Sequence, residues 1–97
     1  MLINEKSPVI KAIGLMSGTS LDGVDLAFCT FSLVDERWTF TTEAAETYSY
    51  TDEWLEILKN LHLQSASKIF EVDAALGRYY GELIKKFIKK NNLHPDL

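Results

Sequence analysis

One run near the start of this 97-residue chain decides its fold: Ile13-Gly14-Leu15-Met16-Ser17-Gly18-Thr19-Ser20-Leu21-Asp22-Gly23-Val24-Asp25. The run joins two apolar, strand-like segments through a tight loop of small residues, hydroxyls and a carboxylate. Glycine accepts positive φ angles and has no Cβ, so a ligand can approach such a backbone closely. Loop N–H groups and hydroxyls can bind an anion, and the carboxylates of Asp22 and Asp25 suit magnesium or a sugar hydroxyl. The alternative interpretation is an ordinary hairpin turn with glycine in its usual place.

Three extended segments make up the first half of the chain. The residues from 9 to 16 are apolar and β-branched, those from 24 to 33 alternate with a two-residue period, and those from 38 to 48 are rich in threonine and aromatics. Each connection is only a few residues long. This spacing predicts an antiparallel meander over residues 9–48.

The second half has the pattern of helices. Thr51 precedes two acidic residues, as at a helix start, and either Ser65 or Ser67 can cap a second, longer helix. Apolar residues recur every three or four positions and stop at Asn91-Asn92. We therefore expect a helical segment over residues 51–92.

Two features of the longer helix have structural interpretations. Gly77 and Gly81 lie four residues apart, which predicts close packing against another element, because glycine inside a helix costs about 1 kcal/mol. Lysines crowd the last turns, where cations complement the helix dipole, and we expect them to form a solvated helix end. They are Lys85, Lys86, Lys89 and Lys90.

The composition favours a globular protein of one domain or less. The chain is 46% apolar and 25% charged with a net charge of −4, which argues against a nucleic-acid partner. Cys29, the only cysteine, lies in an apolar run and is expected to be a small buried core residue. We find neither a secretory signal nor an apolar stretch near the roughly 20 residues of a membrane span. These observations predict a soluble, cytoplasmic protein with no membrane partner.

The loop fits neither of two common phosphate-binding motifs. Val24-Asp25 stands where a Walker A loop needs lysine and a hydroxyl residue, and a strand follows in place of a helix. The glycines at 14, 18 and 23 do not fit G-x-G-x-x-G either. Phosphate binding here would need a strand–turn–strand setting.

Two segments resemble those of one known family. Residues 14–25 resemble the opening signature of the anhydro-N-acetylmuramic acid kinases, and Val72-Asp73-Ala74-Ala75-Leu76-Gly77-Arg78 is similar to their apolar-Asp-x-x-Leu-Gly-Arg segment. That family resembles the sugar kinase, Hsp70 and actin superfamily, whose ribonuclease-H-like core opens with three antiparallel strands. The resemblance implies an α/β fold, namely the N-terminal subdomain of an actin-like ATPase, with a three-stranded meander, two helices and an incomplete sheet.

The resemblance also implies a chemistry. Members use ATP, with Mg²⁺, and water to open the 1,6-anhydro ring of anhydro-N-acetylmuramic acid and phosphorylate O6, which recycles cell-wall (murein) sugar. Asp22 and Asp25 are candidates for metal or substrate, although Asp25 could simply orient the loop. Arg78 could meet an anionic group such as the lactyl carboxylate, with a solvated or structural arginine as the alternative. The expected ATP-phosphate-binding residues are Ser17, Gly18, Thr19, Ser20, Leu21, Asp22 and Gly23.

The sequence departs from the family pattern in one respect. The catalytic aspartate of the family lies in a later Asp-Thr-Gly-Pro-Gly type motif, and neither that motif nor a His-Gly-x-Thr segment occurs here. We therefore expect residues 1–97 to be the N-terminal part of a longer, two-lobed kinase, without a catalytic residue and inactive alone. A nucleotide- or sugar-binding module without turnover, or a structural remnant without a ligand, is the alternative. The open sheet edge makes a homodimer possible.

Overall fold

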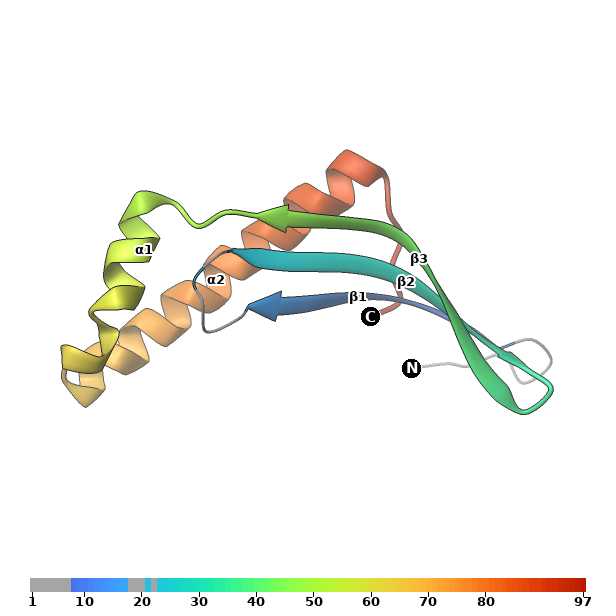
Figure 1. Cartoon of the computed structure of the whole chain (residues 1–97), viewed down its shortest axis with the longest axis horizontal. Coiled ribbons are helices and arrows are strands. Elements are labelled where there is room, and N and C mark those ends of the chain that lie inside the picture. Colours follow the sequence, from blue (N-terminus) through green and yellow to red (C-terminus); the bar gives the residue numbers. More distant parts are fainter. Residues whose placement is uncertain (1–7, 18–20, 22) are drawn as a thin grey trace.

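The structure, a computed structural model, describes residues 8–17, 21 and 23–97. Three strands come first and helices follow (Figure 1), so the expected order of elements is confirmed. A short 3-10 helix, which the sequence did not predict, separates the two α-helices. The elements are β1 (Val9–Ser17), β2 (Val24–Val34), β3 (Arg37–Tyr48), α1 (Asp52–Lys59), η1 (Leu61–Leu63) and α2 (Ala66–Asn91).

The strands form one antiparallel sheet in the order β1-β2-β3. Asp35 and Glu36 connect β2 to β3 with φ angles of 49° and 64°, the left-handed values that suit a tight hairpin turn. The register shifts between Phe28 and Cys29, and Glu43 is left as an extra residue in β3. The meander predicted from residue spacing is therefore confirmed.

The core lies between one face of the sheet and helix α2. Val24 and Leu26 of β2 are almost fully buried and belong to the same cluster as Phe87 of α2, which has no exposed surface. Each such side chain stabilises the fold by roughly 1.5–3 kcal/mol through burial. Successive strand residues point to opposite faces, and this explains why Asp25, between two core residues, is exposed.

Cys29 corrects one expectation. It follows the same alternation, so its side chain lies on the face of the sheet away from α2 and is only half-buried. Its Sγ lies 3.7 Å from the Thr42 hydroxyl of β3. The prediction of a buried core cysteine is therefore wrong, because an apolar run does not reveal which face the helices cover.

Hydroxyl side chains begin both α-helices. The Thr51 hydroxyl accepts a hydrogen bond from the Trp54 N–H at 3.2 Å, and that of Ser65 accepts one from Lys68 at 3.3 Å. Ser65, not Ser67, is therefore the cap of α2. The helix ends at Asn92, which has the left-handed φ of 51° common at helix C-termini.

The end of the chain pairs with the free edge of β1. The Leu97 N–H donates to the Lys11 carbonyl at 3.2 Å, and the Ile13 N–H donates to the Leu97 carbonyl at 3.1 Å. This pattern is that of a parallel bridge. The Asp96 carboxylate also accepts a hydrogen bond from the Lys11 N–H at 2.8 Å. The edge of β1 thus has a partner over this short stretch.

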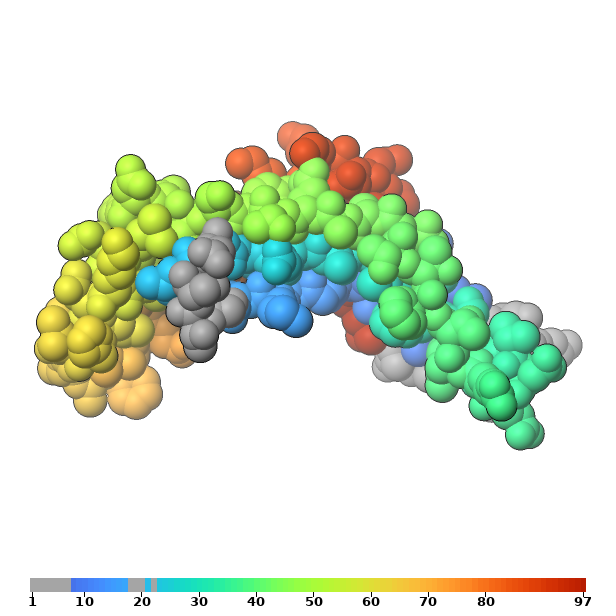
Figure 2. All heavy atoms as spheres, in the orientation of Figure 1, coloured from blue at the N-terminus to red at the C-terminus, as the bar shows by residue number. Residues whose placement is uncertain are grey.

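The far end of the β2–β3 hairpin extends beyond α2 as an arm (Figures 1 and 2). Trp38 and Phe40 lie on this arm and are 51% and 67% exposed. The Phe40 ring packs on that of Phe31, with centroids 5.9 Å apart. The arm therefore carries an apolar surface that the described residues leave open.

The glycines of α2 do not pack closely in the part of the chain that the structure describes. A Cβ built on Gly77 or Gly81 meets no atom within 4 Å. The expectation of close packing is therefore wrong among these residues. Across the same residues, no helix is both long enough and apolar enough to span a membrane.

Candidate functional site

The candidate site is the end of the β1–β2 hairpin. Ser17 and Val24 form its last register pair. Between them, Leu21 has a φ of 60°, which is uncommon for a residue other than glycine. The expected phosphate-binding residues Gly18, Thr19, Ser20 and Asp22 lie outside the described residues. The described members of the predicted set, Ser17, Leu21 and Gly23, thus belong to one turn.

Gly23 is fixed by its neighbours on β3. Its φ is 150°, which side-chain-bearing residues rarely adopt, and an added Cβ would lie 2.7 Å from the Tyr48 carbonyl oxygen. The same Cβ would lie 3.3 Å from a methyl carbon of Thr47. The start of β2 can therefore lie against the end of β3 only because residue 23 is glycine.

Asp25 lies on the face of the hairpin opposite to the buried side chains of Val24 and Leu26. The Thr47 hydroxyl donates a hydrogen bond to its Oδ1 at 2.5 Å, while the side chain stays exposed. The carboxylate also borders a hollow of about 290 Å³, which is lined by Gly14, Leu15, Met16, Asp25 and Ala27. Of the two Asp25 oxygens, only Oδ1 has a hydrogen-bond partner among the residues that the structure describes.

Tyr50 contacts the hairpin from the core side. It is 7% exposed, and its hydroxyl lies 2.8 Å from that of Tyr80 on α2. Burial, followed by the hydrogen bond to Tyr80, raises the pKa of Tyr50 to about 12. The sequence alone does not single out Tyr50. The available signal was a large aromatic between the end of a strand and a helix cap.

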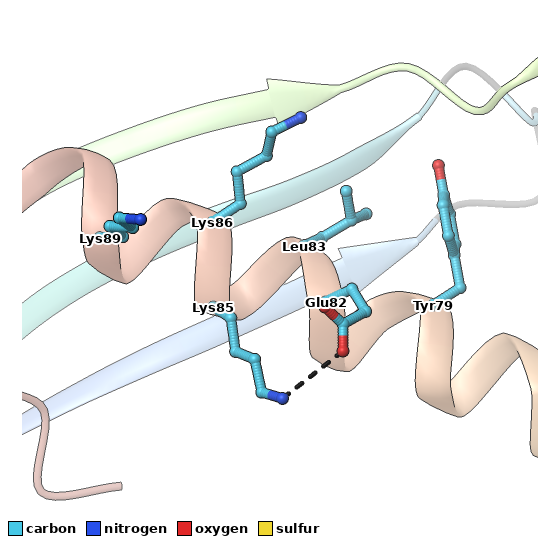
Figure 3. Close-up of a pocket in the computed structure, with 6 residues that line it drawn as sticks. All are labelled: Tyr79, Glu82, Leu83, Lys85, Lys86 and Lys89. Carbon is cyan, nitrogen blue, oxygen red and sulfur yellow. Dashed lines mark hydrogen bonds and ion pairs between the residues drawn. The ribbon is translucent and has the colours of Figure 1, made fainter.

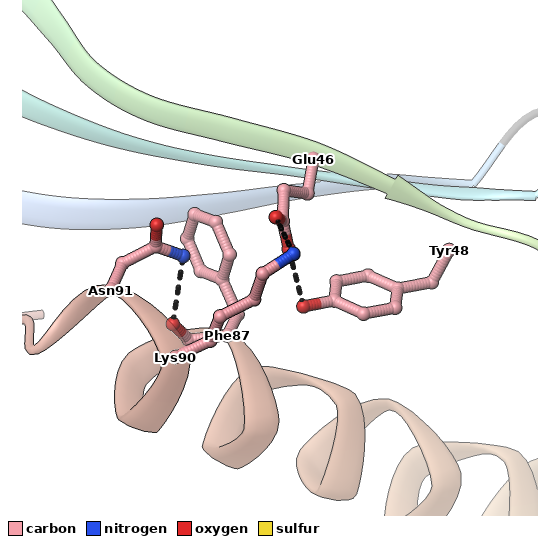
Figure 4. A network of polar contacts seen from close by, with 5 residues as sticks. All are labelled: Glu46, Tyr48, Phe87, Lys90 and Asn91. Atoms are coloured by element: carbon pink, nitrogen blue, oxygen red, sulfur yellow. Dashed lines mark hydrogen bonds and ion pairs between the residues drawn. The ribbon is translucent and has the colours of Figure 1, made fainter.

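A second polar network joins β3 to the end of α2 (Figure 4). Lys90 forms an ion pair with Glu46, and the Tyr48 hydroxyl donates to the same carboxylate at 2.7 Å. The hydrogen bond from Lys90 is the main cause that lowers the pKa of Glu46, and the bond to Glu46 raises the pKa of Tyr48 to about 12. The Lys86 ammonium lies 6.0 Å from the Tyr48 ring centre. Lys90 is therefore not simply part of a solvated helix end.

A hollow of about 430 Å³ lies along α2 (Figure 3). Its lining residues are Tyr79, Glu82, Leu83, Lys85, Lys86 and Lys89, none of which belongs to the hairpin. Lys85 pairs there with Glu82 at 3.5 Å. Arg78, on the same helix, is exposed and forms no hydrogen bond or ion pair with the described part of the hairpin.

The histidine, cysteine and acidic side chains can be compared with the ligands that a metal ion requires. Residues 8–17, 21 and 23–97 contain no group of three histidine, cysteine or acidic side chains that could hold a metal. Mg²⁺ needs less, because it usually takes one or two carboxylates and completes its shell with water and substrate phosphates. The exposed Asp25 carboxylate fits that more modest requirement.

The comparisons with known proteins identify the family of the chain. The family model for anhydro-N-acetylmuramic acid kinase matches residues 10–97, which include both α-helices and all of the β1–β2 hairpin except Val9. The chain belongs to the anhydro-N-acetylmuramic acid kinase family. No solved structure matches the chain.

Relatives that carry the name anhydro-N-acetylmuramic acid kinase come from several bacteria. The protein from Sulfurimonas denitrificans is 40% identical over 84% of this chain, and that from Pasteurella multocida is 33% identical over 94%. A third, from Mannheimia succiniciproducens, is 38% identical over 87%. These matches cover only 22–24% of the relatives' own lengths, so the chain corresponds to less than a quarter of a kinase of this family.

Proposed function

We propose that this chain forms one wall of the nucleotide site in an anhydro-N-acetylmuramic acid kinase. The whole enzyme would use ATP and water to open the 1,6-anhydro ring and place a phosphoryl group on O6, as a cytoplasmic step of cell-wall sugar recycling. The observation that carries the proposal is the family match over residues 10–97. The meander followed by helices is compatible with a ribonuclease-H-like first subdomain, which we propose as its fold.

The phosphate groups of ATP would lie at the β1–β2 hairpin. The proposed set is Ser17, Gly18, Thr19, Ser20, Leu21, Asp22 and Gly23, which offers hydroxyl and backbone N–H donors to an anion. In phosphoryl transfer the protein contributes mainly positioning and charge stabilisation, so the loop must be held still. The contact of Gly23 with the Tyr48 carbonyl and the burial of Tyr50 support such a held geometry.

Two carboxylates are candidates for Mg²⁺ or for a sugar hydroxyl. Asp25 has the exposed position and the neighbouring hollow that either role requires. Asp22 is the second candidate. Bound Mg²⁺ would neutralise phosphate charge, while Asp25 would accept hydrogen bonds from the water around the ion or from the sugar. Arg78 remains a proposed partner for an anionic group of the sugar.

The general base would come from a later Asp-Thr-Gly-Pro-Gly type motif, as the family resemblance implies. The 97-residue chain should then bind MgATP without turning it over. We would measure ADP release with MgATP and anhydro-N-acetylmuramic acid, together with MgATP binding by calorimetry. Binding without ADP release is the expected result. Sugar-dependent ADP release would mean that a base lies within these residues, with Asp22 and Asp25 the first suspects.

A pair of glycine variants tests the location of the site. Gly18→Val should abolish MgATP binding and leave the circular dichroism spectrum largely unchanged. Gly77→Ala is the matched control, because a Cβ at that position meets open space among the described residues. The control should bind MgATP like the wild type. Unchanged affinity in Gly18→Val would overturn the proposed phosphate site.

A further inference from the structure

The outer edge of β3 is free along the arm. β3 is the last strand in the order β1-β2-β3, and no described segment pairs with its other side. Every residue from 37 to 43 is exposed, and this part of the strand extends beyond α2 (Figures 1 and 2). Such an edge presents unpaired backbone N–H and C=O groups to which another strand can bind. The edge of β1 differs, because the end of the chain pairs with it.

The edge strand is regular along most of the arm. Residues 37–42 pair one to one with β2, and Glu43 follows as the extra residue of the register shift. Bulges commonly prevent pairing at an edge, but here the bulge lies at the end of the stretch and leaves residues 37–42 in regular order. Residues that face each other across an antiparallel pair point to the same side of the sheet. A second β3 can therefore pair with this one about a two-fold axis that passes through a residue, not between two residues.

The charges at the two ends of this stretch determine the favoured register. Arg37 and Glu43 are both exposed, and neither forms an ion pair with a described residue. When the axis passes through Phe40, the Arg37 of each copy faces the Glu43 of the other, so the contact contains two opposite-charge pairs. An axis through residue 37 or residue 43 would instead place two like charges opposite each other. Charge complementarity therefore favours pairing centred on Phe40.

Apolar side chains gather around the same axis. Trp38 and Phe40 are 51% and 67% exposed, and the Phe40 ring packs on that of Phe31 on the same face of the sheet. In this register the two copies of Phe40 face each other. Each Trp38 is then a diagonal neighbour of Phe40 in the other copy, within reach of an aromatic side chain. Burial of these exposed rings is the main driving force for association.

We propose that the free edge of β3 binds the same edge of a second copy of this chain, antiparallel and centred on Phe40. The two three-stranded sheets then join into one continuous sheet. The contact is isologous, because both copies use the same surface. The edge of β1 is partly occupied by Asp96 and Leu97, so the assembly closes at two copies. This inference does not rest on the proposed function.

A charge-swap experiment tests both the surface and the register. Arg37→Glu leaves two acidic residues at the ends of the stretch and Glu43→Arg leaves two basic ones, so each variant alone places like charges opposite each other. We expect sedimentation to detect a wild-type dimer at or below about 1 mM, and each variant to dimerise at least about tenfold more weakly. An equimolar mixture of the two variants restores the opposite charges and should dimerise like the wild type.

Lys89→Glu is the matched control for the swaps. It makes the same change of charge as Arg37→Glu at another exposed position, which lies on α2 and not on the arm. The control should leave the Kd of the dimer at the wild-type value. Circular dichroism checks that all variants are folded, as expected for substitutions at exposed positions.

A disulfide experiment tests the register without any change of charge. In a Cys29→Ser background, which removes the only native cysteine, Phe40→Cys places two thiols on the two-fold axis. Opposite Cα atoms in an antiparallel pair lie about 4.5–5.5 Å apart, within the range of a disulfide. Oxidised glutathione should join the two thiols and be reduced to glutathione in the exchange. Trp38→Cys is the control, because the two copies of residue 38 are offset by four positions, about 14 Å, and should not be joined.

The possible results decide the proposal. A wild-type chain that stays monomeric at about 1 mM would overturn it, and so would a dimer that neither swap weakens. A mixture of the swapped variants that fails to dimerise, or a faster disulfide at residue 38 than at residue 40, would show that the register is wrong. Assemblies larger than two copies would contradict the closed contact. Should the swapped variants not fold, the disulfide comparison decides alone.

Discussion

The sharpest test of the hairpin geometry is the substitution Gly23→Ala. The new methyl group would lie 2.7 Å from the Tyr48 carbonyl oxygen, and the backbone would have to keep a φ of 150°. Backbone conformations reserved for glycine cost on the order of 1–3 kcal/mol when another residue adopts them. The contact with a carbonyl oxygen, which belongs to the sheet and cannot rotate away, adds to that cost. We expect a total loss of about 2–4 kcal/mol.

Such a loss is large for a chain of this length. A domain of about 100 residues is stable by roughly 5–15 kcal/mol, and 1 kcal/mol moves its Tm by about 4–8 °C. Gly23→Ala should therefore lower the Tm by at least about 8 °C. Urea denaturation followed by circular dichroism measures the free energy of unfolding directly.

Gly77→Ala is the control for this experiment. At that exposed helical position an added methyl group meets no described atom within 4 Å. Alanine is also the better helix former, so the control should gain about 0.5–1 kcal/mol of stability. The reasoning would be refuted if Gly23→Ala unfolded at the same urea concentration as the wild type.

Three further predictions concern other parts of the molecule. Lys90 lowers the pKa of Glu46 below 4.5. The pair therefore stabilises the fold above that pH, and its contribution is lost as the pH falls through the folded pKa. Acid titration of Glu46→Gln should show a smaller loss of stability below pH 4.5 than the wild type does. Phe87→Ala should cost about 3–5 kcal/mol in urea, because Phe87 is fully buried in the core, and a loss under 1 kcal/mol would contradict the described packing. The arm that exposes Trp38 and Phe40 lies at the free edge of β3. Any homodimer that sedimentation detects should therefore be weakened by Trp38→Lys. A dimer that persists unchanged would exclude this surface as the dimer interface.

The sheet was predictable because its signals are local. The two-residue alternation at Val24, Leu26 and Phe28 identifies a strand with one buried face, and short connections leave an antiparallel meander as the simple arrangement. The helix starts were predictable for the same reason, since a cap depends on neighbours three residues away. The choice between Ser65 and Ser67 was not, because both offer the same hydroxyl.

The wrong and the missing predictions depend on distant contacts. The sequence does not reveal which sheet face or helix face has a neighbour, so Cys29 and Gly77 were both assigned closer packing than they have. The glycines and hydroxyls of the β1–β2 hairpin predict a phosphate site there, and that location stays a prediction. The pairing of Tyr50 with Tyr80 was not predictable, because the two residues lie 30 positions apart and only the fold brings their hydroxyls together.

The pairing of Asp96 and Leu97 with the edge of β1 has a consequence for folding during synthesis. Lys11 and Asp96 are 85 residues apart, and a ribosome that adds about 5–20 residues per second needs roughly 4–17 s to cover that interval. A β-hairpin such as β1–β2 forms within about 10 μs. During synthesis the hairpin can therefore exist for seconds before its outer edge receives a partner. In that interval β1 exposes unpaired N–H and C=O groups beside apolar side chains, a surface on which another nascent strand, or a chaperone, could bind.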